Sequence, residues 1–279
     1  GYYDHNMTVM FERVSDHLEN PSKYTPRQRL HYIRAGEVIV STGSIERPIS
    51  FGNNDRPGIF LSSAAREYMK VYDTLVGKKP IIFTNNDSAY ATALEFIKND
   101  INPIIVDTRD GSDGQLVKEV QDLDIKIRFK SGIANTKGHL KIKSATIGTL
   151  DSEKEKFIAL EEVDCDCICM SGGWTPTVHL SSQAGNKLKF NEDIDAFVPD
   201  KKRQKETAVG SANGAFTLNQ SLAEGFQVGF ELSNKFTSND QKTDTPSSNE
   251  PEQKPHEKLW CMPLPDGQKP KRFIDFQND

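Results

Sequence analysis

The stretch that decides the fold is residues 80–107, PIIFTNNDSAYATALEFIKNDINPIIVD. It starts with a short apolar run that predicts a buried strand, and a second apolar run, 103–107, predicts another. Between the two runs, Ala89, Ala93 and Ile97 recur at helical spacing, which predicts a helix with one apolar face. Strand, helix and strand in this order form a βαβ unit with parallel strands, and we expect its crossover to be right-handed.

The loop after the first strand decides whether this unit binds a nucleotide. Dinucleotide-binding units carry G-x-G-x-x-G here, because a side chain at the second glycine would meet the pyrophosphate. This loop has Thr84, Asn86 and Ala89 at the three positions, and only the third is accepted. Asp107 stands where an acid would bind a ribose, although an acid at a strand end is common. We therefore predict a degenerate copy of a nucleotide site, with Asn85-Asn86 keeping the turn in the left-handed conformation.

Two turns of small residues are the candidate ligand sites. Ser41-Thr42-Gly43 ends a short buried strand at 38–40, and Gly210-Ser211-Ala212-Asn213-Gly214 follows another at 207–209. Ligands of open α/β sheets lie at the carboxyl ends of strands. The second turn also precedes a helical pattern, and the N–H groups that open a helix favour an anion. Both turns are equally compatible with ordinary sharp turns, so the residues alone leave the two interpretations open.

Composition excludes several classes of function. The net charge of −5 and the sequence pI of about 5.8 are not those of a nucleic-acid binder. No run approaches the roughly 18 apolar residues of a membrane span. Cys165, Cys167 and Cys169 alternate along a predicted strand, where residues i and i+4 lie roughly 13 Å apart, too far to share one zinc. We expect them to be small buried hydrophobic residues, with no metal site, in a reducing, cytoplasmic compartment.

Six stretches together resemble the α subunits of heterotetrameric sarcosine oxidases. They keep the order of that family along the whole chain: GYYDHN (1–6), STGSIERPISFGNNDRPGIFLSSAAR (41–66), IIFTNNDSAYATAL (81–94), SGGWTPTVHLSSQAGNKL (171–188), GSANGAFTLNQSLAEG (210–225) and FIDFQND (273–279). More distantly, the layout is similar to flavoprotein disulfide reductases, in which a second domain ending in a β-meander interrupts one dinucleotide domain. The β-strand patterns at 138–149 and 156–170, with no helix between them, match that meander.

The resemblance implies an α/β, FAD/NAD(P)-binding, Rossmann-like fold, in which an incomplete dinucleotide domain is interrupted by a second one with a β-meander. We expect these parts: 1–50 and 171–235 as the first domain, 51–170 as the second, degenerate domain, 236–259 as a flexible linker and 260–279 as the start of a next segment. The linker assignment also rests on 237–258, which has no large apolar residue. Because the chain is apolar again after it, we expect something beyond the linker for that segment to dock against.

The resemblance also implies a function. Members of the family oxidise sarcosine and pass its methylene group to tetrahydrofolate. The α subunit binds NAD in its first dinucleotide domain, FMN lies at the interface with the β subunit, and FAD lies in β. The full α subunit is much longer, so this chain would be an internal part of it, inactive alone, with β, γ and δ subunits as partners. By position on the fold, its contribution to NAD would come from Thr42, Gly43, Ser211, Ala212 and Asn213, and no catalytic residue is expected.

Two other functions remain open at this point. A FAD-containing, NAD(P)H-dependent oxidoreductase of the pyridine nucleotide-disulfide reductase type would have a similar layout. It would need glycines at positions 84 and 86 and a redox C-x-x-C, neither of which occurs. An assembly scaffold without any nucleotide would need none of these features.

Overall fold

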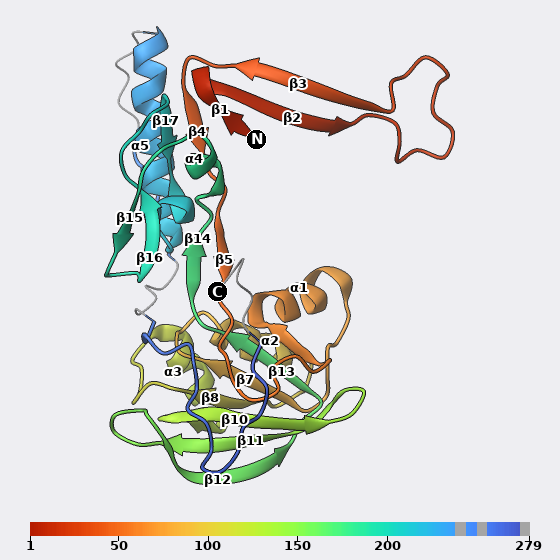
Figure 1. Ribbon diagram of the computed structural model, residues 1–279, viewed down its shortest axis with the longest axis vertical. Helices are drawn as coiled ribbons and strands as arrows, with labels where there is room; N and C mark the ends of the chain where they lie inside the picture. The colour runs from red at the N-terminus through yellow and green to blue at the C-terminus, as the bar shows by residue number, and fades with distance from the viewer. Residues whose placement is uncertain (238–243, 250–255, 274–279) are drawn as a thin grey trace. The chain divides into compact units, whose positions relative to one another are not determined.

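The computed structural model describes residues 1–237, 244–249 and 256–273. The chain divides into two compact units (Figure 1). Unit 1 comprises 1–44 and 175–250, and unit 2 comprises 45–174 and 251–279. The chain therefore leaves unit 1, builds most of unit 2 and returns.

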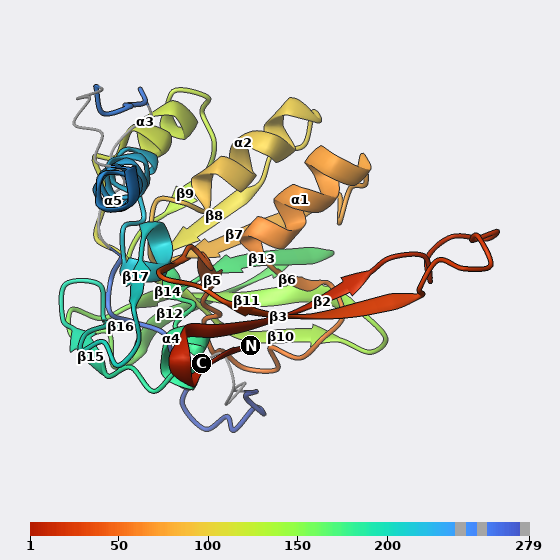
Figure 2. The same ribbon diagram turned by 90° about the horizontal axis from the view of Figure 1, so that it is seen from above.

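Unit 2 is built on a five-stranded parallel sheet in the order β6-β13-β7-β8-β9. Its strands are β6 (Ile59–Leu61), β7 (Pro80–Thr84), β8 (Ile104–Asp107), β9 (Ile127–Arg128) and β13 (Cys167–Ser171). Helices α1 (Ser62–Tyr72), α2 (Tyr90–Lys98) and α3 (Gln115–Gln121) cover one face (Figures 1 and 2). The other face is covered by the antiparallel strands β10 (Ser131–Gly138), β11 (Ile142–Leu150) and β12 (Phe157–Asp164). The predicted βαβ unit is β7-α2-β8, and the predicted meander is β10-β11-β12.

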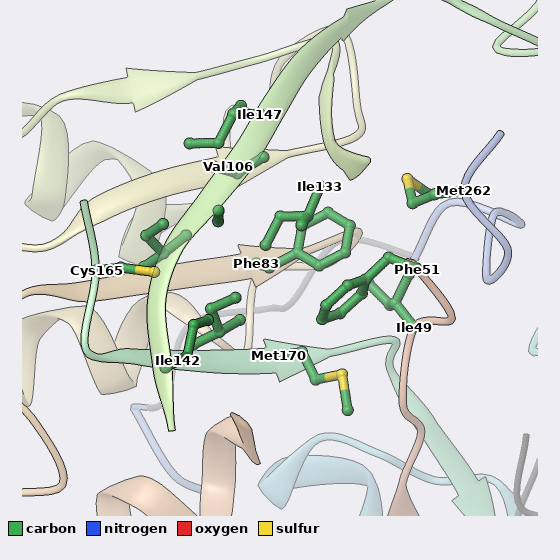
Figure 3. Close-up of a cluster of buried hydrophobic side chains, with 13 residues drawn as sticks. Ile49, Phe51, Phe83, Val106, Ile133, Ile142, Ile147, Cys165, Met170 and Met262 are labelled. Carbon is green, nitrogen blue, oxygen red and sulfur yellow. The ribbon is translucent and has the colours of Figure 1, made fainter. Parts of the chain in front are cut away.

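The sheet of unit 2 separates two hydrophobic clusters. On the meander side, Phe83 of β7 packs with Phe51 at a ring distance of 5.6 Å, and Ile133 of β10 lies above them (Figure 3). On the helical side, Tyr90 and Phe96 of α2 are fully buried. The apolar runs of β7 and β8 are continuous because a parallel strand inside such a sheet is covered on both faces.

The three neighbouring cysteines do not lie on one straight strand, so this part of the prediction is wrong. β12 ends at Asp164 in the meander, and β13 begins at Cys167 in the parallel sheet. Cys165 lies in the meander-side cluster, whereas Cys167 and Cys169 lie in the helical-side cluster. All three are buried, as expected, and burial raises the pKa of the Cys165 thiol to about 12. Within the described residues, no group of three or more His, Cys, Asp or Glu side chains could hold a metal ion.

Unit 1 consists of small sheets, short helical turns and one long helix. A three-stranded antiparallel sheet contains β1 (Tyr2–Tyr3), β2 (Met7–Arg13) and β3 (Gln28–Arg34), with a 3-10 turn, η1 (Asp4–Asn6), after β1. β15 (Leu188–Asn191) and β16 (Ala196–Pro199) form a hairpin that follows α4 (His179–Gln183). β5 (Ser44–Glu46) pairs with β14 (Trp174–Pro176) where the chain passes between the units. A parallel pair, β4 (Val38–Val40) and β17 (Glu206–Ala208), is followed by η2 (Gly210–Asn213) and α5 (Leu218–Thr237).

The described part of the C-terminal segment packs on unit 2 itself. Met262 is fully buried in the meander-side cluster, and Leu259 packs against the same cluster. The apolar residues after the polar stretch therefore have their docking place within this chain. The structure differs from the predicted linker 236–259 at both ends. At one end α5 continues to Thr237, and at the other end residues 256–259 contact unit 2. Residues 238–243 and 250–255 of the linker lie outside the described part. The same holds for 274–279 of the final segment.

Candidate functional site

The predicted site residues gather at one edge of the β4–β17 pair. The two strands are parallel, with Val40 opposite Ala208, and the Val209 N–H donates to the Val40 carbonyl at 3.0 Å. Thr42 and Gly43 follow the end of β4, and Ser211 lies in η2 after the end of β17. Since the strands run in the same direction, both turns start from the same carboxyl edge. This edge is where ligands bind in open α/β sheets.

Space is available beside Gly43. Its φ of +76° is a conformation that few side-chain-bearing residues adopt, and a Cβ added there would meet nothing within 4 Å. The neighbouring Thr42 Oγ donates to the Thr177 carbonyl at 2.7 Å, and the Thr177 N–H donates to the Gly43 carbonyl at 3.0 Å. The turn is therefore fixed in place by Thr177 while its glycine stays open.

The second turn differs from its prediction. η2 is a separate 3-10 turn, and α5 begins only at Leu218, so the glycine-rich stretch does not open that helix. The Gly210 N–H donates to Glu224 of α5 at 2.9 Å, and the Asn213 side-chain amide donates to the same carboxylate at 3.2 Å. An internal carboxylate thus takes the N–H group at the start of the turn. Sequence reasoning missed Glu224, which lies 14 residues after Gly210.

The remaining members of this turn differ in exposure. Ala212 is buried, Ser211 is half-buried and Asn213 is exposed. Among the described residues, no group hydrogen-bonds to Ser211 Oγ. Ser211 therefore offers a hydroxyl at the same edge as the open Gly43. We call Thr42, Gly43 and Ser211–Asn213 the edge site.

In unit 2, the corresponding ligand position lies between β7 and β13. From β7 the chain builds outward through β8 to β9, then returns to β13 on the other side of β7. The strand order reverses there, and the crevice at such a switch point is where open α/β sheets bind ligands. The loop 84–88 lies at the carboxyl end of β7, so its side chains decide what this crevice can hold.

The loop 84–88 is closed by its own hydrogen bonds. The Asn86 side-chain amide donates to the Ser171 carbonyl at 3.0 Å, and its carbonyl oxygen accepts from Ser88 Oγ at 2.6 Å. Thr84 Oγ donates to the Asn86 carbonyl at 2.9 Å. Neither Asn85 nor Asn86 has a positive φ, so the predicted left-handed turn is wrong. Side chains, rather than backbone handedness, hold this loop.

Asp107 also has an internal partner in place of a ribose. It accepts from Tyr90 Oη at 2.8 Å and from Arg109 Nη2 at 2.7 Å. Arg109 in turn donates from Nη1 to Asp87 at 2.8 Å. All four side chains are buried. Burial alone would lower the pKa of Arg109, but hydrogen bonds and the charges of both carboxylates raise it overall, so the guanidinium stays charged.

Residues 256–262, here named the strap, cross this switch point. The Asn85 side-chain amide donates to the Glu257 carbonyl at 2.8 Å, and the Glu257 N–H donates back to the Asn85 carbonyl at 2.9 Å. Trp260 Nε1 donates to the Gly172 carbonyl at 2.7 Å, and the guanidinium of Arg47 lies 4.9 Å from its ring centroid. Asn85 follows β7 and Gly172 follows β13. The strap therefore spans the crevice from one strand end to the other.

Another buried acid, besides Asp87 and Asp107, lies in unit 2. Glu46 of β5 accepts from the Ser63 N–H at 2.8 Å and from Ser63 Oγ at 2.6 Å, at the start of α1. Its burial raises the pKa of the carboxyl, although the bonds from Ser63 and Ser171 act in the opposite direction. Its hydrogen bonds to the start of α1 give it a structural role in unit 2.

Comparison with known proteins agrees with the predicted resemblance. No protein-family model matches the chain. It is 33% identical over 234 residues to sarcosine oxidase subunit alpha of Corynebacterium sp. (strain P-1), covering 82% of this chain and 24% of that protein. It is 31% identical over 294 residues to the subunit of the same name from Rhizobium meliloti (strain 1021), covering all of this chain and 27% of that protein. The chain thus spans about a quarter of these relatives, and its similarity to the α subunit is confirmed over that part.

Solved structures confirm the fold class. T. acidophilum thioredoxin reductase matches with a TM-score of 0.57 and 12% identity, over 75% of this chain and 69% of that one. The L-proline dehydrogenase from P. horikoshii matches with a TM-score of 0.52 and 22% identity, over 76% of this chain and 37% of that one. The fold is the FAD/NAD(P)-binding, Rossmann-like α/β fold. No helix in the described ranges is long and apolar enough to cross a membrane.

Proposed function

We propose that this chain is the NAD-holding and structural portion of a sarcosine oxidase α subunit. The complete complex would demethylate sarcosine oxidatively to glycine, with tetrahydrofolate as the methylene acceptor. The similarity to sarcosine oxidase α subunits over most or all of the chain supports this proposal. FMN and FAD would be bound elsewhere in the complex, and β, γ and δ subunits would complete it.

The observation that carries the NAD assignment is the contrast between two strand edges. At the β7–β13 edge of unit 2, the Asn85 side chain bonds to the strap and Asp107 is paired with Arg109. At the β4–β17 edge of unit 1, Gly43 borders open space. A nucleotide needs a backbone that it can approach closely. The edge site of unit 1 meets that requirement, whereas the edge of unit 2 is filled by the protein itself.

The residues of the edge site fit a binding role. Gly43 would let the nucleotide approach the backbone, Thr42 and Ala212 would shape the turns, and the side chains of Ser211 and Asn213 would offer polar contacts. NAD is a carrier of hydride, but we assign no catalytic residue to this chain. A reductase that binds a nucleotide in both domains is disfavoured, because the loop at Thr84 and Asn86 is closed by side-chain hydrogen bonds.

The test uses the complete heterotetrameric complex and measures NAD released from the purified protein. Gly43→Trp should lower the NAD affinity more than tenfold, because the indole fills the open space beside the turn. Gly267→Trp is the matched control, since Gly267 also has a positive φ, of +72°, and nothing within 4 Å of an added Cβ. Unchanged NAD content in both Gly43→Trp and Ser211→Trp would contradict the assignment and favour a scaffold without nucleotide.

A further inference from the structure

The hairpin of β2 and β3 has one uncovered apolar face. In the register of this pair, Val9 lies opposite Tyr32 and Phe11 opposite Leu30. Because side chains alternate between the faces of a strand, these four residues share one face. The hairpin extends away from β17 in both views (Figures 1 and 2). We call these four residues the hairpin face.

The apolar side chains of the hairpin face are largely exposed to solvent. Phe11 is 57% exposed, Leu30 50% and Tyr32 67%. Alternation of apolar and polar residues along an antiparallel strand is typical of a sheet with one buried face. β1 pairs only with Met7 and Thr8, so the rest of the hairpin has two strands, and a two-stranded hairpin without such burial is marginally stable in water. The sequence is therefore that of a covered hairpin, and nothing in the described residues of unit 1 covers it.

The opposite face of the hairpin is polar toward its tip. Glu12 accepts from His31 Nε2 at 2.8 Å and from Arg29 at 3.2 Å. The hydrogen bond to His31 holds the pKa of the Glu12 carboxyl below its usual value. Met10 and Ile33 lie on this face nearer the base of the hairpin. A partner that buries apolar surface therefore meets the hairpin face and leaves the Glu12 cluster in water.

Charge identifies the kind of partner. Arg34 and Arg13 lie at the two ends of the hairpin face, opposite Met7 and Gln28. Residues 7–34 contain five Lys or Arg and three Asp or Glu, whereas the whole chain has a net charge of −5. Two copies of this hairpin would bring like charges together, which opposes a homodimer through this face. A protein surface with an apolar centre and a carboxylate rim is the complementary occupant.

We propose that the hairpin face docks on another subunit of the complex, on an apolar patch bordered by Asp and Glu side chains. This inference rests on the proposed function in one respect, namely that the chain works inside a complex of several subunits. The relatives are named as a subunit, which supports that premise. Phe11 and Tyr32 are the anchors, because aromatic side chains carry much of the binding energy at interfaces.

The test uses the full-length α subunit and its partner subunits, with affinity measured as the complex reassembles. Phe11→Ser combined with Tyr32→Ser should weaken the association at least a hundredfold. Arg34→Glu should weaken it about tenfold and reduce its dependence on salt. The control is Leu140→Ser, because Leu140 is 81% exposed on the meander of unit 2 and should leave the affinity unchanged.

An affinity within twofold of the parent protein for the double variant would overturn the inference. If that variant also lowers the melting temperature of the isolated α subunit, the same polypeptide covers the face. If it instead loses binding to anionic phospholipid vesicles, the face contacts a membrane surface. NAD content measured on the same samples separates a failure of this inference from a failure of the proposed NAD role.

Discussion

Arg109 of unit 2 offers the sharpest test of the closed nucleotide copy. Its side chain is 9% exposed and joins two carboxylates, Asp87 and Asp107, whose side chains are 2% and 0% exposed. Arg109→Met keeps most of the apolar stem but removes the charge. Both carboxylates then lose their cation inside the protein. Breaking a buried ion pair in this way costs about 3–5 kcal/mol.

A loss of that size is a large part of the stability of a typical domain, which is about 5–15 kcal/mol. The assay is urea unfolding followed by tryptophan fluorescence, because the two tryptophans, Trp174 and Trp260, both lie in unit 2. Arg128→Met is the matched control. Its partner Glu161 has a side chain that is 60% exposed, so this pair should contribute at most about 1 kcal/mol. If the two variants lose equal stability, the buried network does not hold the loop, and our account of the closed site is wrong.

Three further predictions concern the same unit. Met262→Ala should lower the unfolding free energy by about 2–5 kcal/mol in urea melts, since the side chain is fully buried, whereas Leu264→Ala, at a 40% exposed position, should change it little. The double variant Thr84→Gly, Asn86→Gly has the first two glycines of the dinucleotide motif but should show no NAD binding to unit 2 by calorimetry, because the strap still crosses the crevice. Measurable binding there would refute the inference that the strap blocks the crevice. The raised pKa of Glu46 means that the folded state binds its proton more tightly, so its ionisation should cost stability as pH rises above the usual value of 4.5. Glu46→Gln should therefore flatten this fall in melts between pH 4 and 8, and an unchanged slope would contradict it.

The sequence predicted well what depends on local patterns. The apolar runs and helical spacing of 80–107 predicted β7-α2-β8 within a few residues, because hydrophobic periodicity reflects which face is buried. The missing glycines at Thr84 and Asn86 predicted a loop without room for phosphate.

The missed features depend on contacts between distant residues. Asn85 and Glu257 are 172 positions apart, and no local pattern reports their pairing. The sequence pattern did not predict the break between β12 and β13 at Cys165–Asp166, because the cysteines continue the alternation expected of a single strand. The pairing of Arg109 with Asp107 is the one missed contact that a local pattern could have indicated, since an arginine two residues after an aspartate can reach back to it. The NAD role of the edge site and the domain assignments stay predictions.

The interrupted layout has a consequence for how the chain folds. Val40 and Ala208 pair directly, yet a segment of about 170 residues separates them and would have to close as one loop. Once unit 2 has formed, the Arg47 N–H donates to the Gly173 carbonyl at 2.8 Å, so the two exits of the insertion are already held together. The remaining loop is then roughly fourfold shorter, which lowers its closure entropy by about 1.2 kcal/mol. If unit 2 forms first, it therefore shortens the loop that must close before β4 and β17 can pair.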